Sequence, residues 1–140
     1  MYYNFETDLH VGINAENRFE RIAQERIGGE PKRSDNHKFD LQLSGCRIEC
    51  KMDVMAERTG NIAVEIAAYG RPSGIATTLA DAFVYIIGNN AYIVDTETLR
   101  RLVKECRTKA GGDKINGVGQ AIFALLPINR LEQHSVKVLV

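Results

Sequence analysis

Three residues of this chain, Asp40, Glu49 and Lys51, have types and spacings that suit metal-assisted chemistry. Segments 38–44 and 47–53 each alternate between apolar and polar side chains, and a Ser-Gly pair joins them, which predicts a β-hairpin. With a two-residue turn, the register sets Asp40 directly opposite Glu49 and places Lys51 on the same face. The two carboxylates would repel each other unless a cation lay between them, and oxygen ligands favour Mg²⁺.

A lysine beside such a cation predicts a specific reaction. Lys51 could lower the pKa of a water molecule or stabilise the charge that develops on a phosphate group. The combination therefore indicates hydrolysis of a phosphodiester by a metal-activated water.

The Glu-x-Lys spacing alone is common, and the chain contains a second match at residues 30–32. That match contains a proline and follows two glycines, where no strand is expected. The alternative for the hairpin is a solvated polar sheet face, which should carry opposite charges across the strands. The predicted register instead opposes two acids, Asp40 and Glu49, and like charges there are destabilising. We therefore favour a functional interpretation.

A helix predicted over residues 14–27 adds a third acid. Its apolar positions recur at helical spacing, and Glu16 falls inside that apolar stripe rather than on the solvent face. An acid on a core-facing stripe needs a partner, and a metal held by Asp40 and Glu49 would be one. The alternative is that Glu16 forms a charge pair near the start of the helix or lies closer to solvent.

The elements needed to position these residues fit one α/β domain, 1–140, with a mixed central sheet flanked by helices. After the helix and the hairpin, the pattern predicts a strand at 61–67, a loop at 70–77, a short helix at 78–82, strands at 83–88 and 91–95, a helix at 96–109, a loop at 111–119, a strand at 121–126, a turn or short helix at 127–131 and a last strand at 136–140.

The loop after the third strand has the composition of a phosphate-binding segment. Its glycines allow close backbone approach, its hydroxyls offer uncharged hydrogen bonds, and a helix beginning at Thr78 would add amide groups. The candidate DNA-binding residues are Arg71, Ser73, Gly74, Thr77 and Thr78. The alternative is that Thr77 or Thr78 caps the helix while Asp81 bonds back to the loop. Glu65, in the preceding strand, could support the metal or face solvent.

Phe39-Asp40, followed by Glu49-Cys50-Lys51 and preceded by a helix with Glu16, resembles the PD-(D/E)XK nuclease superfamily. The resemblance implies a restriction-endonuclease-like αβββαβ core. It further implies that Asp40 and Glu49 hold Mg²⁺, with Mn²⁺ able to substitute. The Cys50 carbonyl and Glu16 would complete the metal shell, and Lys51 would assist the attacking water. Phe39 departs from the proline of the motif.

A second block, residues 59–65 and 70–81, resembles small phage and prokaryotic endonucleases and Holliday-junction-resolvase-like members of the same superfamily. Together the two matches cover roughly residues 12–95, and the C-terminal third resembles the superfamily only loosely. The resemblance implies a DNA substrate, and a dimer is expected because cutting both strands of a duplex needs two sites.

Composition limits the remaining choices. The chain has 18 basic and 18 acidic residues, which argues mildly against general nucleic-acid binding and for a focused binding surface. No apolar run is long enough to span a bilayer and the N-terminus lacks a secretory pattern, so we expect a cytoplasmic protein of a prokaryote or of a phage-infected host. The main alternative function is a non-catalytic nucleic-acid-binding module on the same fold. A third interpretation is an unrelated α/β domain in which the hairpin arose by chance.

Overall fold

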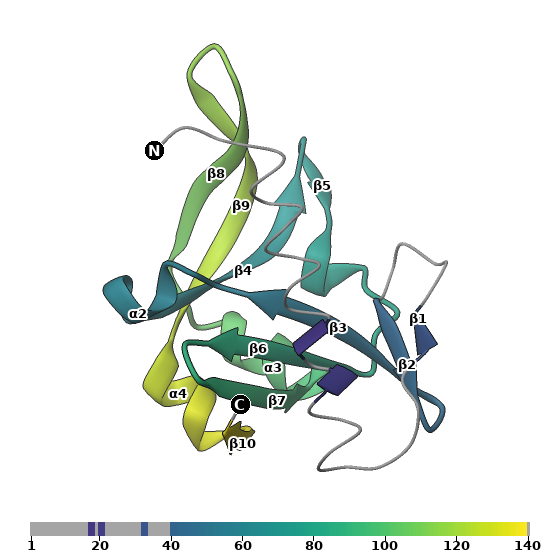
Figure 1. Ribbon diagram of the computed structural model, residues 1–140. Coiled ribbons are helices and arrows are strands. Elements are labelled where there is room, and N and C mark those ends of the chain that lie inside the picture. The colour runs from purple at the N-terminus through teal and green to yellow at the C-terminus, as the bar shows by residue number, and fades with distance from the viewer. Residues whose placement is uncertain (1–16, 19, 22–31, 34–39, 140) are drawn as a thin grey trace.

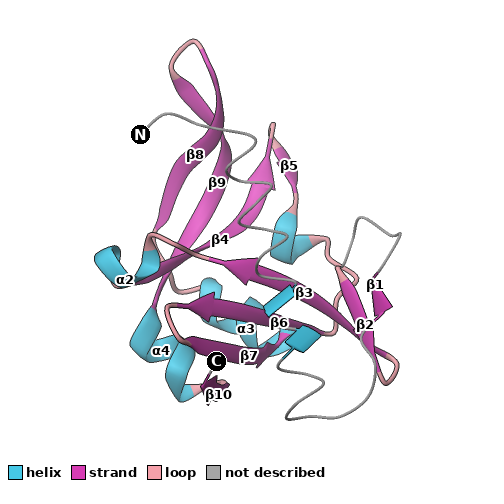
Figure 2. Cartoon of the chain, in the orientation of Figure 1, coloured by secondary structure: helices cyan, strands magenta, loops and turns pink. Residues whose placement is uncertain are grey.

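The computed structural model describes residues 17–18, 20–21, 32–33 and 40–139. Within these residues the fold is α/β, with the strands arranged in two sheets, A and B, and the short helices packed around them (Figures 1 and 2). Residues 17–18 and 20–21 are helical, as the predicted N-terminal helix requires. The rest of that helix, including Glu16, lies outside the described residues.

Sheet A, in the described part of the chain, contains six strands in the order β1-β2-β3-β6-β7-β10. The β3–β6 pair is parallel and the other pairs are antiparallel, so the sheet is mixed, as predicted. The strands are β1 (Lys32–Arg33), β2 (Leu41–Leu43), β3 (Cys46–Met52), β6 (Ala82–Ile87), β7 (Asn90–Asp95) and β10 (Val136–Leu139).

Sheet B contains four described strands in the order β5-β4-β9-β8, all antiparallel, and they run across those of sheet A in Figure 1. They are β4 (Asn61–Ala68), β5 (Arg71–Pro72), β8 (Thr108–Ile115) and β9 (Val118–Pro127). The helical elements are α2 (Ala56–Thr59), the 3₁₀ turn η2 (Gly74–Ala76), α3 (Thr96–Val103) and α4 (Ile128–Gln133).

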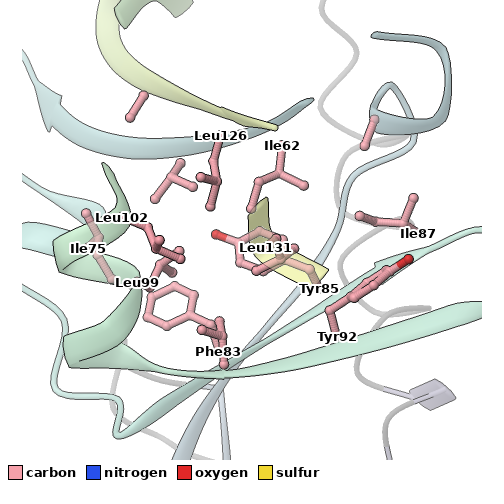
Figure 3. Packing of buried hydrophobic residues seen from close by; sticks show 14 of the residues in the cluster. Ile62, Ile75, Phe83, Tyr85, Ile87, Tyr92, Leu99, Leu102, Leu126 and Leu131 are labelled. Carbon is pink, nitrogen blue, oxygen red and sulfur yellow. The ribbon is translucent and has the colours of Figure 1, made fainter. Parts of the chain in front are cut away.

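Apolar residues from both sheets form the main core. Figure 3 shows Ile62 and Leu126 of sheet B approaching Phe83 and Tyr85 of sheet A, with Leu99 of α3 closing one side. These side chains are at most 4% exposed, which makes the contact between the two sheets a principal source of stability. A second cluster, built on Leu41, Ile48 and Val84 among others, lies on the opposite face of sheet A.

Two predicted elements are wrong, and a third, a helix, forms but is shorter than predicted. No helix forms at 78–82, where an irregular segment leads into β6. The helix predicted over 96–109 ends at Val103, and β8 begins at Thr108. The predicted loop at 111–119 belongs instead to the long β8–β9 hairpin, which extends beyond the rest of the domain in Figure 1.

Candidate functional site

The centre of the candidate site is a pair of oppositely charged side chains on β3. Glu49 and Lys51 lie two residues apart on the strand and so point to the same face, and the Lys51 Nζ is 3.0 Å from Glu49 Oε1. The Glu49 side chain is 16% exposed whereas that of Lys51 is 52% exposed. The Glu49 carboxylate is therefore largely buried, while the Lys51 side chain can still reach a bound molecule.

Nearby acids set the charge of Lys51. Partial burial opposes that charge, but attraction to Glu49, a hydrogen bond to the same carboxylate and attraction to Asp40 and Glu65 outweigh burial and raise the lysine pKa. Lys51 is consequently a cation at neutral pH. It can neutralise or orient an anion, but it is not poised to remove a proton.

Asp40 contacts β3 through hydrogen bonds to the backbone of that strand, and not through the predicted pairing opposite Glu49. The β2–β3 register pairs Leu43 with Cys46 and Leu41 with Ile48, as expected, but the ladder of paired residues ends there. The Asp40 amide donates to the Ile48 carbonyl at 3.0 Å, and the Asp40 Oδ2 accepts the Cys50 amide at 2.9 Å. The direct opposition of Asp40 and Glu49 was therefore wrong in detail, although both acids act electrostatically on Lys51.

A pocket of about 400 Å³ opens in front of the Glu49–Lys51 pair, between the two sheets. Sheet A supplies one wall, and the other comes from β4 and from the segment around η2. Asp40 is not among its lining residues. The polar and charged side chains that line it are those of Glu49, Lys51, Asp53, Glu65, Thr77, Thr78 and Tyr85.

Glu65 faces the pair from sheet B and is held in place by the loop that follows β5. Ser73 Oγ donates a hydrogen bond to Glu65 Oε2 at 3.0 Å. Gly74, with φ +56°, lies so close to the strand that a Cβ there would stand 2.2 Å from the Glu65 carbonyl oxygen. Only glycine fits this position, so the loop can pack directly against the strand that carries the acid.

Two further polar groups, Asp53 and Tyr85, line the pocket. Asp53 at the end of β3 accepts the Met55 amide at 3.2 Å and the Ala63 amide at 3.1 Å, which ties β3 to β4. Tyr85 is buried beside Glu49 and Asp53. Burial and the negative charge of these acids raise its pKa, so its hydroxyl stays protonated.

The predicted DNA-binding loop contributes to the pocket only in part. Gly74, Thr77 and Thr78 line the pocket and Ser73 positions Glu65, whereas Arg71 is exposed on β5 and does not line it. Since no helix begins at Thr78, the expected cluster of helical amides is absent from this described segment.

The capping predictions for this loop were also wrong. Thr78 Oγ1 accepts the Ala80 amide at 3.0 Å, and Asp81 pairs with Arg47 at 3.0 Å instead of bonding back to the loop.

Sequence reasoning missed the roles of Asp53 and Tyr85 and left open whether Glu65 supports the metal or faces solvent. The alternating pattern of β4 contained a signal for Glu65, but the partner sheet was not foreseen. Within the described residues, no three His, Cys, Asp or Glu side chains gather closely enough to form a metal site by themselves. Glu16, the fourth predicted ligand, lies outside those residues.

Comparison of the chain with models of known families, with curated proteins and with solved structures finds no match. In the described part of the chain, no helix has the length and apolar character needed to cross a membrane. The site must therefore be interpreted from its own geometry.

Proposed function

We propose that this protein is a metal-dependent endonuclease that hydrolyses DNA phosphodiester bonds at the Glu49–Lys51 pair. The observation that carries the proposal is a largely buried carboxylate, Glu49, 3.0 Å from a half-exposed lysine cation, Lys51, at the wall of a pocket. Such a pair offers negative charge to a cation and positive charge to a phosphate within one small site.

The chemistry of the donor set fits Mg²⁺. The acids that act on Lys51, namely Asp40, Glu49 and Glu65, offer only oxygen ligands. Proteins usually bind Mg²⁺ through one or two carboxylates and leave the other positions to water and substrate phosphates, so a cluster of three protein acids is not required. Asp40 and Glu49 would hold the ion, together with the Cys50 carbonyl and Glu16. When bound, Mg²⁺ supplies an activated water and charge stabilisation.

The side chains of the pocket have separable tasks in this proposal. Lys51 contacts the phosphate oxygen on which charge develops, because it is cationic at neutral pH. Thr77 and Thr78, which line the pocket, would donate hydroxyl hydrogen bonds to the neighbouring phosphate. Glu65, held by Ser73, keeps Lys51 charged from the opposite wall.

The proposal includes a restriction-endonuclease-like core and a homodimer. The β2–β3 hairpin and the parallel β3–β6 pair support the restriction-endonuclease-like core, since β3, which carries Glu49 and Lys51, lies inside a mixed sheet. A homodimer would bring two such sites to the two strands of a duplex.

The test is a cleavage assay with Mg²⁺ on linear, single-stranded, nicked and four-way-junction DNA, using wild type, Glu49→Ala and Lys51→Ala. We expect wild type to cut at least one substrate and both variants to lose cleavage. DNA binding without cleavage under every condition would refute the proposed reaction and favour a non-catalytic binding module.

A further inference from the structure

A second pocket, of about 650 Å³, adjoins the candidate site on the outer side of sheet B. The two pockets share Asp53, Ala63 and Phe123 as lining residues, so they adjoin each other. The second pocket reaches from α2 and β4 across β9 to β8. Because the two pockets are neighbours, a long ligand of the first pocket can extend toward the second past these shared residues.

Strand register defines which side chains face these pockets. Glu65 of β4 pairs with Phe123 of β9, which pairs with Lys109 of β8. Directly paired residues project on the same side of a sheet, so this row leads from the acid of the first pocket to a lysine at the sheet edge. Arg107, whose carbonyl accepts the Leu125 amide at 2.9 Å, lies beside the row and lines the second pocket with Lys109.

The far end of the second pocket is basic. Arg107 and Lys109 are both exposed, and within the described residues no carboxylate forms an ion pair with either. Asp53 is the acid that lines this pocket, and its carboxylate is engaged by two backbone amides. Phe123 and Leu125, half-buried, form an apolar floor between the acidic and basic ends.

We propose that Arg107 and Lys109 bind the backbone of the DNA strand whose scissile phosphate lies at Glu49 and Lys51. This inference rests on the proposed function and adds the residues that hold the substrate strand away from the site of cleavage. Glu65 and Lys109 are two strand spacings apart, about 10 Å. That distance equals the rise of roughly three nucleotide steps along the axis of a duplex.

A DNA-binding measurement tests the proposed DNA groove, the surface that carries Arg107 and Lys109, independently of cleavage. The probe is a fluorescein-labelled 20-base-pair DNA duplex in EDTA, with anisotropy measured over a range of salt concentrations. We expect Arg107→Ala/Lys109→Ala to weaken binding and to reduce the slope of log K against log salt by about 2, because two phosphate contacts are lost. Arg101→Ala/Lys104→Ala, which removes the same charge from exposed residues outside both pockets, is the matched control and should leave the slope unchanged.

Kinetics adds a second test. With Mg²⁺, the Arg107→Ala/Lys109→Ala variant should show a raised KM and an unchanged kcat on the same duplex. It should hydrolyse the small diester bis(p-nitrophenyl) phosphate at the wild-type rate, because that molecule does not reach β8.

The two proposals fail separately. If wild type cuts DNA but the variant and its control bind and cut alike, the groove is refuted and the nuclease stands. If wild type binds DNA through Arg107 and Lys109 yet cuts nothing, the groove stands and the nuclease is refuted. Absence of DNA binding by wild type would overturn the groove.

Discussion

Gly74 packs against the backbone of Glu65, and a Cβ at residue 74 would lie 2.2 Å from the Glu65 carbonyl oxygen. The same loop provides the Ser73 hydroxyl that binds the Glu65 carboxylate. The close backbone packing of Gly74 and the hydrogen bond from Ser73 therefore act together to hold Glu65 at the wall of the pocket. The wall of the candidate site that comes from sheet B depends on this contact.

Gly74→Ala should destabilise the protein more than the same change at another glycine of positive φ. Gly70, with φ +75° and nothing within 4 Å of its ideal Cβ, is the matched control. Gly70→Ala should cost about 1–3 kcal/mol from backbone strain. Gly74→Ala should cost about 1–3 kcal/mol beyond that, because its methyl group also meets backbone atoms that cannot move freely. Urea denaturation of both variants measures the difference, and equal losses would contradict the predicted contact.

Ser73→Ala removes the hydroxyl that donates to Glu65 Oε2. We expect a loss of about 1 kcal/mol in the free energy of unfolding and a slower cleavage reaction, because Glu65 can leave the pocket. Ser135→Ala is the control, since the Ser135 Oγ is buried with no hydrogen-bond partner among the described residues. Its removal should be neutral or slightly stabilising. Unchanged stability and cleavage in Ser73→Ala would argue against a positioning role.

Glu49→Gln should lower the pKa of Lys51. Burial disfavours the lysine charge, and the charge and hydrogen bond of the Glu49 carboxylate are the largest of the opposing effects, so their loss leaves burial less compensated. Titration of the lysine side chains by NMR measures the shift. Lys137 is an internal control, because its raised pKa comes from a hydrogen bond to Glu132. A Lys51 midpoint that does not move would contradict the pairing.

The pairing of Arg47 with Asp81 joins β3 to the start of β6 and predicts a dependence of stability on pH. Hydrogen bonds from the Arg47 side chain and amide hold the Asp81 pKa below its ordinary value of 3.8. The stabilisation is therefore complete above that value and is lost as the pH falls through the lower pKa of the folded protein. Asp81→Asn should remove this part of the acid dependence in urea denaturation measured below pH 5. Identical pH profiles for wild type and variant would exclude the effect.

The hairpin that carries Glu49 and Lys51 could be predicted because its information is local. Alternation defines the two faces, and the turn residues Ser44 and Gly45 adopt φ +51° and +82°, which suit a two-residue connection. The register followed correctly as far as Leu41. The position of the Asp40 carboxylate could not be derived in this way, because the residue leaves the ladder and binds the Cys50 amide.

Sheet B could not be predicted because its central pairing, β4 with β9, is distant in sequence. Residues of β4 pair with β9, as Val64 does with Ala124, and no local pattern specifies that partner. Gly111 and Gly112 indicated a loop, but they mark a register irregularity inside the β8–β9 hairpin, with φ +70° at Gly112. Alternation placed Glu65 on the strand face of Ala63 and Ala67 but left open whether it supports the metal or faces solvent, and only the packing of sheet B on sheet A shows that it lines the pocket.

The most direct test of the central claim is the rate at which supercoiled plasmid DNA is cut in Mg²⁺ by wild type and by Glu49→Gln. Glu132→Gln, which changes an exposed acid of α4 outside both pockets, controls for the loss of one negative charge. The account predicts cutting by wild type and Glu132→Gln that stops in EDTA, and a rate at least about 100-fold lower for Glu49→Gln. Equal rates for Glu49→Gln and wild type would contradict it.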